Sequence, residues 1–445
     1  NMKFIPGSRL NDVVYFNPAD TAYPLGFNPL EVTNPNQKTN ISSEVIGVLK
    51  RMFGESWGPR LEYILRYTIL ALLDRPETTM LDITRMLTDK NFRKETLGYC
   101  RDTVVLQFWN VEFASWNDKF VAEAVAPVLN KVGAFTANPI IRNIIGQPKS
   151  TFNIRQIMDE GKILIVNLSK GLIGEDNAAI LGSFLVTKIQ LAAMSRSDIP
   201  DIRDRRPFYL YVDEFQNFAT DSFATILSEA RKYGLNLTVA NQYISQMNET
   251  VRDAVFGNVG TMISFRVSAD DAPILAKQFE PNFESVDLLQ MHNRNFVINM
   301  VIGGEKTPAF SARTLELPPS QADNTPHIIE HSRRMYSRNR EDVEREINAA
   351  IMPNHRPKNQ PVQPRPQAVA AAALAQPVKK AASQPAQKTN TAANTQPVTS
   401  QTATNSGEVI LQIRGNNTLD KPADSTDPAA ATAPKKRRRR RRRAG

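Results

Sequence analysis

The sequence contains a single cysteine, Cys100, in 445 residues. One cysteine excludes a disulfide framework and is typical of proteins that work in a reducing compartment. Long hydrophobic segments are also missing, because the two longest candidates, 63–73 and 180–194, are interrupted by Arg66 and Lys188. Neither reaches the ~18 consecutive apolar residues of a membrane-spanning helix. No segment of the given sequence has the pattern expected of a signal peptide. We therefore expect neither a disulfide-rich secreted protein nor a membrane span in this sequence.

Aromatic residues are absent from 353–445, which also hold 17 Lys and Arg against 4 Asp and Glu. The remaining 352 residues hold 38 basic and 41 acidic side chains, so their net charge is −3 although the whole chain carries +10. At the level of net charge, this balance excludes a basic nucleic-acid-binding surface on the folded part and leaves only local patches.

The segment 353–445 is rich in Ala, Gln, Thr, Pro and Asn and contains 11 of the 29 prolines. Because this composition buries too little apolar surface to offset its ordering entropy, we predict a disordered tail. An apolar run at 409–413 is either a short docking strand or a chance cluster. The tail ends in nine consecutive cations: Lys435, Lys436, Arg437, Arg438, Arg439, Arg440, Arg441, Arg442 and Arg443. Such a cluster binds phosphates without reading sequence; the alternatives are a solubilising end or a contact to anionic lipid head groups.

Two patterns divide the folded part. Residues 13–16 are typical of a buried strand, and Pro18, Pro24 and Pro29 then indicate an extended loop. From about residue 40 to 145, apolar residues recur every three or four positions, which predicts an all-α unit.

After residue 156 the pattern changes to short, mostly unalternating apolar runs separated by helical patterns. Strands that are buried on both faces have this pattern. The predicted strands are 163–166, 208–212, 235–240 and 261–265, and the predicted helices are 177–196, 222–233, 245–256 and 269–279. This alternation predicts an α/β fold with a parallel sheet, helices on both faces and right-handed crossovers. Residues 296–302 and 309–315 predict a hairpin at one edge of the sheet, and 340–351 a final amphipathic helix.

The strongest candidate for chemistry is the pair Asp213 and Glu214, which directly follows the apolar strand 208–212. Ligands bind at the carboxyl edge of parallel sheets. In nucleotide hydrolases with this arrangement, the first acid holds a water of the Mg²⁺ shell and the second orients the attacking water. The alternative is a strand that ends in acids because a loop begins there.

Gln242 and Arg231 extend this site in different ways. Gln242 lies just past the strand 235–240, at the same carboxyl edge, where its amide can sense a γ-phosphate or the attacking water. Arg231 precedes that strand, so it lies at the amino edge, and six residues at ~3.3 Å each separate the two edges by ~20 Å. A functional Arg231 therefore acts on a neighbouring subunit; the alternative is a solvated cation at a helix end.

Residues 1–320 resemble the hexameric HerA/FtsK-type DNA-translocating ATPases, and among them the type IV secretion coupling proteins of the TraG/TraD group. The resemblance rests on the combination of these segments: 12–20, 26–29, 161–168 with Gly171 and Gly174, 211–215, and 229–234 leading to 240–242. Members of this family carry an all-α domain inserted into a RecA-like core, and this domain corresponds to 40–145.

The resemblance implies a RecA-like P-loop NTPase core with a mostly parallel sheet. Its expected parts are the start of the core (1–36), the all-α insertion (37–150), the core with the Walker B strand (151–320), a helical extension (321–352) and the tail. It implies ATP-driven DNA translocation by a homo-hexamer, with ATP and Mg²⁺ as cofactors. Asp213 and Gln242 are expected to bind the nucleotide, and Asp213 to hold Mg²⁺ through water. The expected partners are DNA, in single-stranded form, and proteins of the secretion apparatus or relaxosome, at the cytoplasmic face of a bacterial inner membrane.

One departure from the family is serious: the sequence contains no Gly-x-x-x-x-Gly-Lys-Ser/Thr motif. In the family this phosphate-binding loop, like any membrane anchor, lies upstream, so we expect a truncated chain that is inactive alone. Two other hypotheses stay open. One is a motor of the same fold with another cargo, either a HerA-like chromosomal translocase or a protein-secretion ATPase. The other is a non-catalytic adaptor that docks DNA or other cargo.

Overall fold

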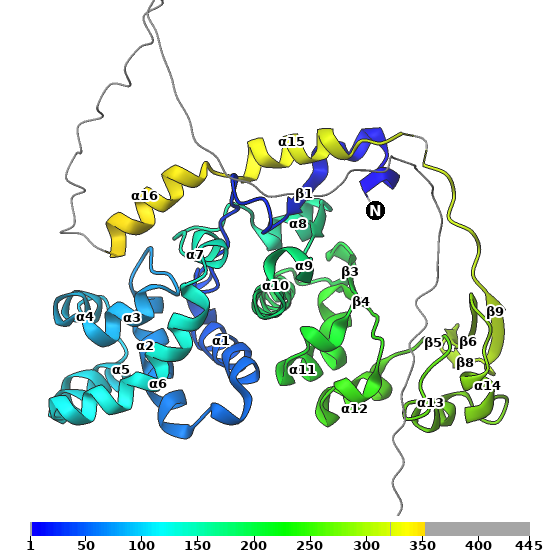
Figure 1. The fold of residues 1–445 in the computed structure, drawn as a ribbon, viewed down its shortest axis with the longest axis horizontal. Coiled ribbons are helices and arrows are strands. Elements are labelled where there is room, and N and C mark those ends of the chain that lie inside the picture. Colours follow the sequence, from blue (N-terminus) through cyan, green and yellow to red (C-terminus); the bar gives the residue numbers. More distant parts are fainter. Residues whose placement is uncertain (1, 321, 352–445) are drawn as a thin grey trace, which may run out of the picture. The chain divides into compact units, whose positions relative to one another are not determined.

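The computed structural model describes residues 2–320 and 322–351, without the side chains of residues 221 and 222. The predicted disordered tail, its nine cations and the apolar run at 409–413 lie outside the described residues. Figure 1 labels the helices and strands by the names used below.

Four of the predicted strands form two parallel ladders. Strand β1 (Val13–Phe16) pairs with β2 (Ile163–Val166), and β3 (Phe208–Val212) pairs with β4 (Leu235–Val239). Within the described residues the two ladders are not hydrogen-bonded to each other. The parallel pairing predicted from the sequence is therefore confirmed within each ladder.

Helix α10 (Glu175–Ser195) is the central helix of the core. It is apolar on all sides, as a buried helix must be, and most of its residues are buried. By length and composition, 175–198 is the one single helix of the described residues that could cross a membrane, but most of it is buried inside the protein. Two neighbouring helices, α6 (Asp118–Thr136) and α7 (Pro139–Ile145), pass that test only as a pair bent by 98°.

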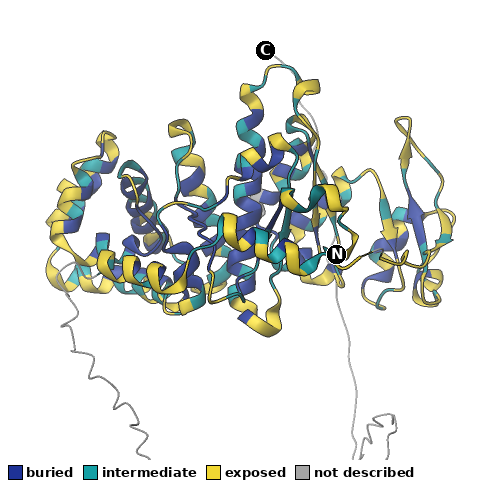
Figure 2. Ribbon diagram, turned by 90° about the horizontal axis from the view of Figure 1, so that it is seen from above, coloured by how far each residue is buried: buried dark blue, intermediate teal, exposed yellow. Residues whose placement is uncertain are grey.

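The segment between β1 and β2 is helical, as the apolar periodicity predicts. Besides α6 and α7 it contains α1 (Lys38–Phe53), α2 (Pro59–Asp74), α3 (Asp82–Thr88), α4 (Lys90–Leu97), α5 (Thr103–Gln107) and α8 (Ile154–Glu160). Helix α2 ends two residues before Pro76, because the residue before a proline disfavours the helical conformation. Buried residues, dark blue in Figure 2, lie on the inward faces of these helices.

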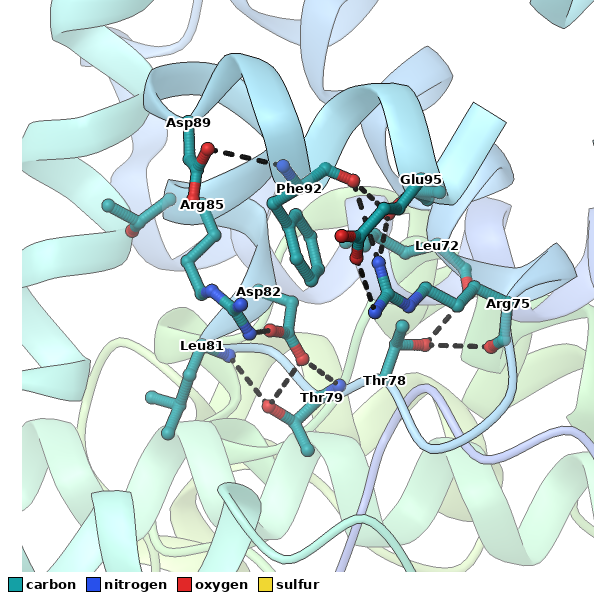
Figure 3. A network of polar contacts seen from close by, with 12 residues as sticks. Leu72, Arg75, Thr78, Thr79, Leu81, Asp82, Arg85, Asp89, Phe92 and Glu95 are labelled. Atoms are coloured by element: carbon teal, nitrogen blue, oxygen red, sulfur yellow. Dashed lines mark hydrogen bonds and ion pairs between the residues drawn. The ribbon is translucent and has the colours of Figure 1, made fainter. Parts of the chain in front are cut away.

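A polar network around Phe92 joins α2, α3 and α4 (Figure 3). The Phe92 ring lies between two guanidinium groups, with centroid distances of 4.4 Å to Arg75 and 3.9 Å to Arg85. Asp82 accepts a hydrogen bond from Arg85 at 2.8 Å and another from the Thr79 backbone at 2.8 Å. Cation–π contacts and charge-assisted hydrogen bonds therefore fix the angles between these short helices.

A separate, three-stranded antiparallel sheet shows that one prediction is wrong. Strand β5 (Met262–Ser264) pairs with β6 (Asn295–Asn299), which pairs with β9 (Phe310–Arg313). The small hairpin of β7 (Val301–Ile302) and β8 (Glu305–Lys306) lies between β6 and β9 in the sequence. The hairpin that we expected at the edge of the parallel sheet consists of β6 and β9. Its partner is β5 and not a strand of the parallel ladders. The expectation that β5 belongs to the parallel ladder is therefore wrong within the described residues, since strand propensity does not specify the neighbour.

The expected burial of both faces is also wrong for β3. Phe208, Leu210 and Val212 point into the protein, whereas Tyr209 and Tyr211 remain 62% and 71% exposed. Because tyrosine is counted as apolar, an apolar run of this kind predicts a strand that is buried on both faces. Its hydroxyl group, however, tolerates contact with water.

The last described helices are α15 (Thr325–Tyr336) and α16 (Arg340–Ile351), which confirms the predicted final helix. The Ser332 hydroxyl of α15 accepts a hydrogen bond from the Tyr15 backbone of β1 at 2.9 Å, and Figure 1 shows the two elements together. The remaining α-helices are α9 (Lys170–Ile173), α11 (Asp221–Glu229), α12 (Glu249–Asn258), α13 (Ala272–Phe279) and α14 (Ser285–Leu289).

Candidate active site

The carboxyl ends of β3 and β4 lie side by side and bring the predicted acid pair next to Gln242. The Ala240 backbone donates to the Val212 carbonyl at 2.9 Å, and the Phe215 backbone donates to the Ala240 carbonyl at 2.9 Å. The parallel register therefore continues past the last strand residues. The segments that carry Glu214 and Gln242 leave the sheet together.

The two oxygens of the Glu214 carboxylate accept hydrogen bonds from two different amides. Gln242 Nε2 lies 2.5 Å from Oε1, and Gln216 Nε2 lies 2.6 Å from Oε2. The backbone of Glu214 has φ +51°, a left-handed conformation that a residue with a side chain rarely adopts. Such strain persists where surrounding contacts over-determine it. The two amides and the adjacent ladder supply such contacts here.

Asp213 has the exposure that a magnesium ligand requires. Its side chain is exposed, and one carboxylate oxygen accepts a hydrogen bond from the Glu214 backbone at 3.0 Å. No group of three or more potential metal ligands occurs among the described residues. Mg²⁺ is commonly bound through only one or two carboxylates together with substrate phosphates and water. Asp213 fits that mode of binding.

Arg231 is not brought to this edge. It lies in the short 3₁₀ helix 230–233 that precedes β4, so the full length of that strand separates it from Gln242. Its side chain is exposed, and within the described residues no carboxylate pairs with it. The geometry agrees with the expected position at the amino edge, and the role of Arg231 stays a prediction.

The short 3₁₀ helix 215–217, which follows Glu214, is contacted from two sides. Arg51 of α1 donates a hydrogen bond to the Gln216 carbonyl. Lys170, at the start of α9, donates to the Asn217 side chain at 3.2 Å and to Glu175 at 2.7 Å. The hydrogen bond from Lys170 lowers the pKa of the Glu175 carboxyl. The loop that carries Glu214 is therefore fastened to two different parts of the fold.

Sequence reasoning missed three of these residues: Gln216, Lys170 and Arg51. A local signal for Gln216 exists, because an amide two residues after a strand-ending glutamate can turn back to it. No local signal identifies Arg51, since 165 residues separate it from Gln216.

A groove leads from the acid pair between β2 and β3, along edges that pair with no further strand of the described residues. Its volume is about 490 Å³, and it reaches Lys170, Asp213 and Glu214. The groove is lined by apolar residues of three elements: Leu164 and Val166 of β2, Phe208, Leu210 and Val212 of β3, and Leu185, Val186 and Ile189 of α10. The acids therefore lie at the polar end of a mostly apolar groove.

Comparison with protein families places this site in a known segment. Residues 207–278 match a family model described as the TraM recognition site of TraD and TraG. The segment runs from β3 into α13 and contains Asp213, Glu214, Arg231 and Gln242. The match confirms the resemblance to the TraG/TraD group over these residues. No curated protein sequence matches the chain.

Solved structures of the bacterial conjugative coupling protein TrwB are similar in fold. A trigonal form in complex with sulphate has a TM-score of 0.50 and 13% identity and covers 70% of this chain and 76% of that chain. An unbound monoclinic form has a TM-score of 0.49 and 14% identity and covers 70% and 75%. At this identity the first likeness shows the fold alone. It confirms the expected fold class of a RecA-like core with an all-α domain.

Proposed function

We propose that this chain is the ATPase part of a coupling protein that moves DNA in conjugation or type IV secretion. The observation that carries the proposal is the contact between Glu214 and Gln242 at the ends of two parallel strands, within the segment that matches the TraD and TraG model. The same match favours a coupling protein over a chromosomal translocase or a protein-secretion ATPase. The fixed Glu214 carboxylate favours a catalytic role over an adaptor.

Each site residue has a distinct part in the proposed reaction. Glu214 orients and polarises the water that attacks the terminal phosphate, and its two amide partners hold the carboxylate in place. Gln242 has a second amide hydrogen with which to contact that phosphate. Asp213 is the residue that would hold Mg²⁺, and the bound ion would neutralise charge on the phosphates. Arg231 completes the site of the neighbouring subunit in a homo-hexameric ring.

The proposal extends to partners and location. The name of the matched family model gives a TraM-type relaxosome protein as the partner class for residues 207–278. We place the motor at the cytoplasmic face of a bacterial inner membrane, where a DNA-secretion apparatus would receive its substrate.

The proposal predicts ATP hydrolysis that depends on DNA. Because this sequence lacks the phosphate-binding loop motif, the assay uses a protein that carries this chain together with such a loop. We expect single-stranded DNA to raise the steady-state ATPase rate several-fold at low salt. The same concentration of a polyanion such as heparin serves as the control. Hydrolysis that is absent, or equal with and without DNA, would contradict a DNA-pumping function.

The proposal also predicts a role for the cations at 435–443, outside the described residues. Nine cations bind phosphates by releasing counterions. In a plot of the logarithm of the affinity for single-stranded DNA against the logarithm of the salt concentration, the tail should therefore contribute a slope of roughly −6. The measurement is a salt titration that compares the intact chain with a chain ending at Pro434. Equal affinities and equal slopes would show that the tail is no nucleic-acid anchor and would make anionic vesicles the next ligand to test.

A further inference from the structure

A charged side chain of the all-α region contacts the loop that carries the candidate active-site glutamate. Arg51 lies in the last turn of α1 and donates a hydrogen bond to the Gln216 carbonyl, two residues after Glu214. A charged donor makes this a stronger hydrogen bond than a neutral pair would form. The contact joins two parts of the chain that are 165 residues apart.

Gln216 connects this contact to the reacting carboxylate. It is only 8% exposed, its carbonyl oxygen accepts from Arg51, and its side-chain amide donates to Glu214 at 2.6 Å. One buried residue therefore touches both the all-α region and the proposed catalytic glutamate. If Gln216 moves, its side-chain amide moves with it, and the hydrogen-bond donors around the Glu214 carboxylate change.

Helix α1 provides a rigid base for Arg51. Its apolar face is buried, and it packs against both α10 and α2. An open pocket of about 220 Å³ lies where α1, α10 and the loop meet, and Arg51, Gln216 and Asn217 are among the residues that line it. Arg51 therefore contacts the Gln216 carbonyl at a place that is open to solvent.

We propose that Arg51 and Gln216 are positioning residues through which the all-α region sets the Glu214 carboxylate. This inference rests on the proposed function only for the role that it gives to Glu214. Any partner or DNA strand that moves α1 relative to α10 then alters the hydrolysis step without touching the nucleotide. The all-α region thereby regulates the site through one arginine and one glutamine.

The first test needs no nucleotide and uses the 445-residue chain. Hydrogen exchange is measured at the Phe218 and Ala219 amides, which both donate to the Phe215 carbonyl in the loop. Loss of a charge-assisted hydrogen bond in Arg51→Ala is expected to speed this exchange by about tenfold or more. Lys50→Ala, an exposed neighbour on the same helix, is expected to leave it unchanged. An Arg51→Ala variant that is folded by circular dichroism but exchanges at the wild-type rate overturns the proposal.

The second test separates positioning from stability. In a protein that carries this chain together with a phosphate-binding loop, Gln216→Ala and Arg51→Ala are expected to lower kcat for ATP hydrolysis by about tenfold or more, since small displacements of a reacting group are costly. The KM for ATP should stay unchanged, and Arg51→Lys should restore part of kcat. Wild-type kcat in Gln216→Ala, alongside an inactive Glu214→Gln, overturns the positioning role. If the wild-type protein itself hydrolyses no ATP, the proposed function fails, while the exchange measurement still decides whether Arg51 holds the loop.

Discussion

Glu214→Gln is expected to reduce kcat for ATP hydrolysis by about 10²–10⁴-fold, the range that a positioned acid–base group contributes. The substitution keeps the size of the side chain and removes the charge that polarises the attacking water. Gln216 and Gln242 donate amide hydrogens to different oxygens of Glu214; Glu214→Gln keeps one accepting oxygen and turns a donor toward the other amide, which can flip to accept it. The loop should therefore stay folded and ATP binding should persist. The measurement pairs steady-state hydrolysis with equilibrium binding of a fluorescent ATP analogue, in a protein that carries this chain together with a phosphate-binding loop.

Glu249→Gln is the matched control for this experiment. Its side chain is 82% exposed on α12 and pairs with Arg252 of the same helix. The same charge is removed there without any contact to the site, so we expect wild-type kcat. If the Glu214→Gln protein hydrolyses ATP at the wild-type rate, Glu214 is not a catalytic residue. If the variant no longer binds ATP, the loop has misfolded.

Subunits carrying Arg231→Ala and subunits carrying Glu214→Gln are each expected to be inactive alone and to regain activity when mixed. The reason is geometric, because β4 separates Arg231 from the edge that carries Glu214 and Gln242. In a ring with head-to-tail interfaces, random mixing in equal amounts places an intact Glu214 against an intact Arg231 at about a quarter of the interfaces. The recovered ATPase rate should approach that fraction of the wild-type rate.

Lys232→Ala is the control for the mixing experiment. Lys232 neighbours Arg231, is exposed and pairs with Glu229, so its loss should leave hydrolysis unchanged. Native mass spectrometry establishes that mixed rings have formed. Mixed rings without recovered hydrolysis would show that Arg231 does not act on a neighbouring subunit.

The sequence predicted the central geometry of the site because that geometry follows from local rules. Apolar runs at 208–212 and 235–240 predicted two strands, and parallel strands end at a common edge. The observed contact between Gln242 and Glu214 is the result of this rule. The contact of Gln216 with Glu214 could also have been predicted from the sequence, since Gln216 follows Glu214 by only two residues.

The sequence by itself determined the four strands of the parallel ladders, the helical stretch between β1 and β2, and the acid pair at the end of β3, but not the division of these strands into two ladders. These features depend on side-chain periodicity and on residues close in the chain. Only the tertiary structure decided that β5 pairs with β6 and that Tyr209 and Tyr211 stay exposed. Only it placed Arg51 against Gln216, because that contact depends on how α1 packs on α10. Hydrogen-bond partners distant in sequence are selected by packing, and local propensity carries no information about them.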